Sequence, residues 1–141
     1  MGLFGNLFGS KPQQADPAVE LNRILQRFTT ATLAGVDSQD IGRYPAKQYR
    51  VMAFHYGAIL ELAARFGLDE NSTLGVFVTF IDKYFNLPVS ETGSISERLQ
   101  GFTTDPGQRR YLEAGQAVFR RWHDDNDRRA PLELGRLLQS D

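Results

Sequence analysis

The distribution of apolar residues along the chain predicts helices, and the most apolar of these lies between residues 69 and 87. One helical stripe there consists of Leu74, Phe77, Val78, Ile81 and Phe85, and a second stripe beside it of Val76, Phe80 and Tyr84. Two adjacent apolar stripes leave little polar surface. We therefore expect a central helix at about 69–87, with neighbours on more than one side.

The same stretch has a second interpretation, because residues 75–81 (GVFVTFI) form a run of β-branched and aromatic residues typical of a buried strand. The residues before it, Asp69 to Ser72, favour the helix, since they place capping and acidic side chains where a helix begins. Asp82 and Lys83 then continue the helical pattern without a turn signal.

Other segments of the chain carry helix signals of their own. Asp16 and Asp105 each precede a proline, and this pair of residues suits the N-cap and first position of a helix. The predicted helices span residues 17–33, 45–66, 94–100 and 105–123, and a short last helix docks through Leu134, Leu137 and Leu138. Gly67 has the position of a left-handed helix stop.

Several finer expectations follow from this pattern. Residues 36–44 (VDSQDIGRY) are interpreted as a loop from their Asp, Ser and Gly content. Phe54 falls on the solvent face of its helix, together with the ion pair that Glu61 and Arg65 can form. Gly115 interrupts an apolar stripe, which indicates either the close approach of another helix or a glycine with no packing role.

The fold class is therefore all-α, a single-domain bundle of five to six helices around the helix at about 69–87. Residues 1–15 are assigned to an N-terminal amphipathic or flexible segment, and residues 16–141 to the domain. A chain of 141 residues is long enough to bury a core without disulfides, and it contains no cysteine.

Charge and hydropathy narrow the classes of function. The 16 basic and 17 acidic residues give a net charge of -1, so we expect no nucleic-acid partner. No apolar run reaches the length of a transmembrane helix, and the N-terminus lacks the pattern of a secretory signal. We expect a cytoplasmic protein.

The first residues form a small apolar cluster of Leu3, Phe4, Leu7 and Phe8 at helical spacing. They could act as a hook that docks on a membrane surface or on a partner protein. The interpretation we favour is a frayed or self-packed chain start, because glycines at 5 and 9 weaken so short a helix. Peripheral membrane contact through residues 1–9 is thus the less favoured alternative.

Candidate chemistry is sparse. His123 is followed by Asp124, Asp125 and Asp127, but the spacing does not match a calcium loop, and a solvated acidic helix end is the simpler interpretation. His55 has no acid one helical turn away to orient it, so we expect a partly buried structural histidine. We expect no metal and no cofactor, and the motifs of serine hydrolases and phosphate loops are absent from the sequence.

Thirteen of the sixteen basic residues are arginine, a residue suited to bidentate contacts with carboxylate or phosphate. The predicted interface consists of Arg109, Arg110, Arg120 and Arg121, with Leu3, Phe4, Leu7 and Phe8 as a second patch. The simpler interpretation of these arginines is a helix surface of ion pairs, in which Arg109 and Arg120 pair with Glu113.

Three functions are consistent with the sequence. The leading hypothesis is a non-enzymatic helical module that binds a protein partner, as an adaptor, regulator or inhibitor, or that self-associates as a homo-oligomer. The alternative is a small domain that encloses an apolar ligand, with Tyr56, Phe77, Phe80, Tyr84 and Trp122 as walls. An enzyme comes third and requires His55, Tyr56, His123 and nearby acids to meet in one cleft.

Overall fold

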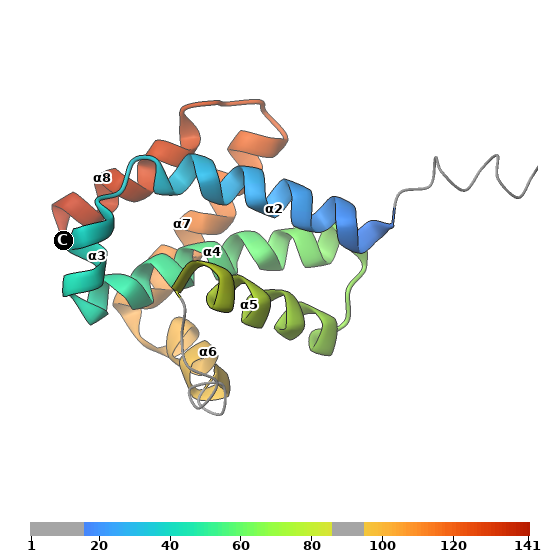
Figure 1. Cartoon of the computed structure of the whole chain (residues 1–141), viewed down its shortest axis with the longest axis horizontal. Helices are drawn as coiled ribbons and strands as arrows, with labels where there is room; N and C mark the ends of the chain where they lie inside the picture. The colour runs from blue at the N-terminus through green and yellow to red at the C-terminus, as the bar shows by residue number, and fades with distance from the viewer. Residues whose placement is uncertain (1–15, 86–94) are drawn as a thin grey trace, which may run out of the picture.

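The computed structural model describes residues 16–85 and 95–141, and over these ranges the chain is all helical, without strands (Figure 1). The all-α, single-domain prediction is confirmed. The elements are α2 (Pro17–Leu33), α3 (Ser38–Arg43), α4 (Pro45–Phe66), α5 (Glu70–Phe85), α6 (Ile95–Thr104), α7 (Pro106–His123), the short 3-10 helix η2 (Ala130–Leu132) and α8 (Glu133–Ser140). The predicted N-terminal patch of Leu3, Phe4, Leu7 and Phe8 lies outside the described residues.

The predicted helix starts and stop are present. The side chain of Asp16 accepts a hydrogen bond of 2.9 Å from the backbone N–H of Ala18, and Asp105 does the same for Gly107. Gly67 ends α4 in the left-handed conformation with φ of 67°, and the N–H of Leu68 reaches back to the carbonyl of Ala63 at 2.9 Å. Local chemistry thus determines where these helices begin and end.

The interpretation of residues 36–44 as a loop is wrong, because this segment contains the helix α3. Asp37 is its N-cap, and its carboxylate accepts hydrogen bonds from the N–H groups of Gln39 and Asp40. The Asp and Ser residues that indicated a loop are the residues that start a helix. The helix predicted at 94–100 extends further, to Thr104.

The helix that the others surround is α4, which packs against α2, α3, α5, α7 and α8. Residues 70–85 of the stretch form helix α5, which excludes the strand interpretation there, but α5 covers one side of α4 and leaves Leu74, Val76 and Val78 only partly buried. The small residues Ala53 and Ala58 are fully buried and let neighbours approach α4 from several directions.

Phe54 in α4 is fully buried, so its predicted place on the solvent face is wrong. Its ring stacks on Phe28 of α2 with centroids 6.2 Å apart. The ion pair between Glu61 and Arg65 on the same helix is confirmed, with N and O 3.6 Å apart. The face of α4 that was predicted to be exposed to solvent is therefore covered by α2 near Phe54 and exposed near Arg65.

The closest helix packing joins α4 and α7. Gly57 of α4 and Gly115 of α7 are both buried, and each lies against the backbone of the other helix. This confirms the close approach expected at Gly115. No helix in residues 16–85 and 95–141 has the length and apolar character needed to cross a bilayer.

Candidate basic groove between α2 and the end of α7

The four arginines of the predicted interface all lie on α7, and each has an acidic partner within the chain. Arg110 reaches Asp141 at 3.0 Å, Arg120 reaches Glu61 at 2.8 Å and Arg121 reaches Asp127 at 3.3 Å. Arg109 pairs more loosely with Glu113, at 3.8 Å. Arg120 thus pairs with α4 and not with Glu113, and the four side chains already bind acids on their own surface.

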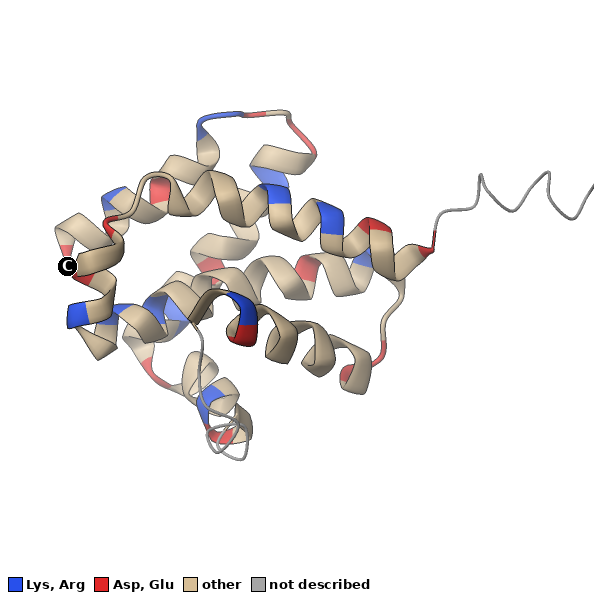
Figure 2. Cartoon of the chain, viewed as in Figure 1, with Lys and Arg blue, Asp and Glu red and all other residues tan. Residues whose placement is uncertain are grey.

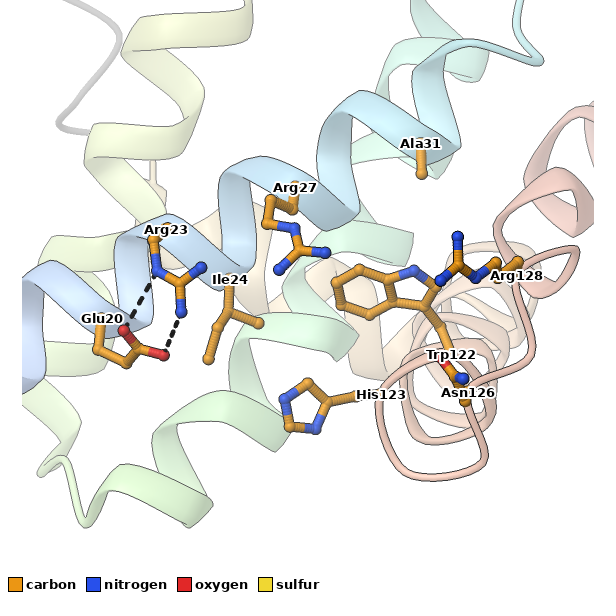
Figure 3. A pocket seen from close by; sticks show the side chains of 9 residues that line it. All are labelled: Glu20, Arg23, Ile24, Arg27, Ala31, Trp122, His123, Asn126 and Arg128. Carbon is orange, nitrogen blue, oxygen red and sulfur yellow. Dashed lines mark hydrogen bonds and ion pairs between the residues drawn. The ribbon is translucent and has the colours of Figure 1, made fainter.

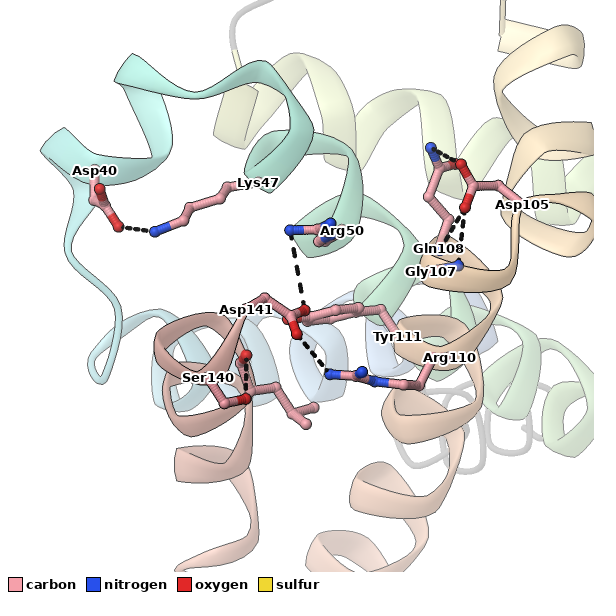
Figure 4. A network of polar contacts seen from close by, with 11 residues as sticks. Asp40, Lys47, Arg50, Asp105, Gly107, Gln108, Arg110, Tyr111, Ser140 and Asp141 are labelled. Carbon is pink, nitrogen blue, oxygen red and sulfur yellow. Dashed lines mark hydrogen bonds and ion pairs between the residues drawn. The ribbon is translucent and has the colours of Figure 1, made fainter.

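Asp141 collects several of these contacts (Figure 4). Its carboxylate accepts a hydrogen bond of 2.5 Å from the Tyr111 hydroxyl, and it lies 4.0 Å from the guanidinium of Arg50. Burial, and then the bond to Asp141, raises the pKa of the Tyr111 phenol. This network attaches α8 to α4 and α7.

A different set of basic residues meets in a groove between α2 and the turn that follows α7 (Figure 3). The groove has a volume of about 460 Å³ and is lined by Glu20, Arg23, Ile24, Arg27, Ala31, Trp122, His123, Asn126 and Arg128. Figure 2 shows basic positions on α2 and on this turn, two segments far apart in the sequence that line the same groove. We call this feature the basic groove.

Two of the groove arginines are available to a ligand. Arg27 and Arg128 are exposed and have no ion-pair partner within 4 Å among the described residues. Arg23, in contrast, holds Glu20 with two hydrogen bonds of 3.2 and 2.6 Å, and these bonds lower the pKa of the Glu20 carboxyl. The charge of Arg27 also acts on Glu20, but without a close ion pair, so the groove contains two guanidinium groups outside ion pairs and one that is already engaged.

The floor of the groove is apolar and continuous with the core. The indole of Trp122 lies 5.3 Å from the Phe28 ring and 5.8 Å from the Phe119 ring, measured between centroids. Ile24 beside it is only 9% exposed. Packing from below therefore holds Trp122 in place, and its partly exposed side faces the groove.

The turn that carries Arg128 has a defined conformation. Asn126 adopts a left-handed φ of 56°, and the N–H of the next residue, Asp127, bonds back to the carbonyl of Arg121 at 3.0 Å. Asn tolerates this conformation better than most residues. The helix stop thus turns the chain so that Asn126 and Arg128 line the groove.

The end of α7 is also tied to α4. Arg65 donates to both oxygens of Asp124, at 2.5 and 2.7 Å, and these bonds lower the pKa of the Asp124 carboxyl to about 2. His123 stacks on Phe119, with its Nδ1 3.4 Å from Asp124. No group of three His, Asp or Glu side chains suited to a metal ion occurs in residues 16–85 and 95–141.

Within the described part of the chain, the five aromatic residues of the predicted ligand pocket lie in different surroundings. Tyr56, Phe77, Phe80 and Tyr84 form a series of ring contacts 5.0 to 6.4 Å apart. Phe77 and Phe80 are buried in that series, Tyr56 borders a hollow beside α6, and Tyr84 borders another beside α3. Trp122 lies in the basic groove.

His55 is fully buried, and not partly buried as predicted. Its Nδ1 lies 2.8 Å from the carbonyl of Val51, and its Nε2 lies 2.6 Å from the hydroxyl of Thr32 in α2. Burial lowers its pKa to about 4. His55, Tyr56 and His123 occupy three separate surroundings, so they do not form the common cleft that the enzyme hypothesis requires.

Sequence reasoning missed Arg27 and Arg128 as site residues. A signal for Arg27 existed, since it follows Arg23 by four positions on the polar face of α2. No local sequence pattern places Arg128 in the same groove as Arg27, because their proximity depends on how α2 packs against the end of α7. No family model, curated protein or solved structure matches the chain.

Proposed function

We propose that the protein is a non-enzymatic interaction module that binds an acidic segment of a partner protein in the basic groove. The observation that supports this most directly is that Arg27 and Arg128 line the same groove from two elements and form no ion pair within 4 Å with any described residue. Guanidinium groups outside ion pairs, beside a partly exposed aromatic side chain, are typical of the anchor sites of protein interfaces.

The interface predicted from sequence receives less support from the charges. Arg110, Arg120 and Arg121 hold acidic side chains of the chain itself, so an incoming carboxylate would compete with an existing ion pair. In the basic groove an acidic side chain can reach Arg27 and Arg128 without displacing one. Trp122 offers apolar contact area for a neighbouring residue of the partner.

The test is a titration of the protein with a short peptide of alternating Glu and Ala, compared with a matched peptide of Gln and Ala. Trp122 is the only tryptophan, so its fluorescence reports on the groove directly. We expect binding of the acidic peptide that weakens with added salt. The Arg27→Ala/Arg128→Ala variant should lose at least about tenfold in affinity, given that each contact is charge-assisted.

A control variant removes the same charge elsewhere. Arg43→Ala/Lys83→Ala changes two exposed basic residues outside the groove that form no ion pair among the described residues. Its affinity should match that of the unmodified protein. Equal loss in both variants, or equal binding of the Gln peptide, contradicts the proposal. Sedimentation of the protein alone shows whether the partner is a second copy of the chain.

A further inference from the structure

The net charge of the basic groove determines how much negative charge a ligand must carry to neutralise it. Its lining carries three arginines and one glutamate, which give a net charge of +2 when His123 is left out of the sum. One carboxylate from a partner segment would cancel only half of this charge. A phosphoryl group, with a charge of roughly -1.5 to -2 at neutral pH, would cancel most of it.

The donor geometry favours the same group. Each guanidinium presents a planar fork of N–H donors, and one fork is enough for the two oxygens of a carboxylate. In Figure 3, Arg27 on α2 and Arg128 on the turn after α7 lie on either side of the Trp122 indole, and Asn126 lines the groove from the same turn with an amide that can donate. Donors on different walls suit a tetrahedral group with three acceptor oxygens.

The size and floor of the groove indicate a peptide and not a free anion. A volume of about 460 Å³ falls in the range of sites for small organic ligands. Inorganic phosphate would leave the partly exposed side of Trp122 in the floor of the groove uncovered. A phosphorylated side chain with its neighbouring residues would cover this floor.

We infer that the basic groove recognises a phosphorylated serine or threonine within the acidic segment of its partner, with Arg27 and Arg128 as the phosphate-binding residues. This inference rests on the proposed function, because it specifies which acidic residue the groove prefers. Phosphorylation of the partner would then control the interaction.

The test uses three peptides of alternating Glu and Ala that differ only at the central position, which holds Ser, Glu or phosphoserine. The full chain is titrated with each peptide, and Trp122 fluorescence is the readout. We expect the phosphoserine peptide to bind at least about tenfold more tightly than the Glu peptide, since it adds charge-assisted bonds to two arginines. Arg27→Ala/Arg128→Ala should remove this preference, and Arg43→Ala/Lys83→Ala should keep it.

The other outcomes separate the two proposals. Equal affinity for the Glu and phosphoserine peptides overturns the inference and leaves the proposed function intact. A failure of all three peptides to bind overturns both. Inorganic phosphate that competes as well as the phosphoserine peptide would indicate a site for the free anion and would also overturn the inference. Circular dichroism of each variant checks that the helices are retained.

Discussion

Gly115 of α7 lies directly against the carbonyl group of Phe54 in α4, so that a methyl group at Gly115 would be 1.8 Å from that oxygen. A second contact of this kind runs in the opposite direction, from α4 to α7: a methyl group at Gly57 would lie 2.1 Å from the carbonyl oxygen of Leu112. Backbone therefore packs on backbone where the two helices cross. The position of α7, and with it the far wall of the basic groove, depends on these two glycines.

Gly115→Ala should strongly destabilise the protein. The added methyl group meets backbone atoms that cannot rotate away, so the helices must separate, and we expect a loss of about 3 kcal/mol or more in the free energy of unfolding. Urea denaturation followed by circular dichroism measures this loss. Gly75→Ala is the control, since a methyl group there has no neighbour within 4 Å and replaces glycine inside α5. It should stabilise the protein by up to about 1 kcal/mol.

Stability should fall as the pH drops below the ordinary pKa of histidine. His55 has a pKa of about 4 in the folded protein and about 6.5 when unfolded, so the unfolded state binds the proton first as the pH falls. The contribution of His55 to the free energy of unfolding is complete above pH 6.5. It decreases as the pH falls, and about 3 kcal/mol of it is lost at pH 4. Urea denaturation at several pH values measures this change.

His55→Gln removes the titrating group and supplies the control for this pH dependence. The variant should be less stable at pH 7, and its stability should change much less between pH 6.5 and 4. Asp124, with its pKa of about 2, should contribute only at lower pH. An unchanged slope in His55→Gln would assign the acid sensitivity to other groups.

Two neighbouring threonines of α2 should respond in opposite ways to the same substitution. Thr32→Val removes the hydroxyl that bonds Nε2 of His55 and leaves this nitrogen unsatisfied, at a cost of about 1–3 kcal/mol. The hydroxyl of Thr29 is buried without a hydrogen-bond partner among the described residues. Thr29→Val should therefore be neutral or stabilise by up to about 1 kcal/mol. Thermal or urea unfolding of the two variants measures the difference. Equal losses in the free energy of unfolding would show that the hydrogen bond between Thr32 and His55 does not stabilise the protein.

Glu20→Gln should strengthen binding in the basic groove. The substitution removes the carboxylate that occupies Arg23 and leaves a third guanidinium for the ligand. We expect the affinity for the acidic peptide to rise by about threefold at low salt and to return toward that of the unmodified protein at high salt. Glu133→Gln is the control, because it frees Arg136 outside the groove lining. A gain in both variants would reflect net charge alone.

Short-range signals in the sequence were enough for most of the fold. Asp16, Asp105 and Gly67 act within one helical turn, so the residues themselves show where helices begin and end. The loop prediction for residues 36–44 is wrong because Asp and Ser both favour loops and start helices. The burial of Phe54 and the central place of α4 depend on which helices pack together, which hydrophobic periodicity does not specify.

The same limit applies to the candidate site. The arginine-rich face of α7 was visible in the sequence, but the partners Glu61 and Asp141 that occupy Arg120 and Arg110 come from elements distant in the chain. Arg27 and Arg128 are distinguished from the other arginines by what lies next to them in space. A charge pattern along one helix does not contain that information.

The pairing of Phe54 with Gly115 also has a consequence for synthesis. On the ribosome, α4 emerges with the apolar side chains that pack on α7 still uncovered, because α7 is translated about sixty residues later. The nascent chain must keep these apolar side chains from associating with other chains until α7 leaves the exit tunnel.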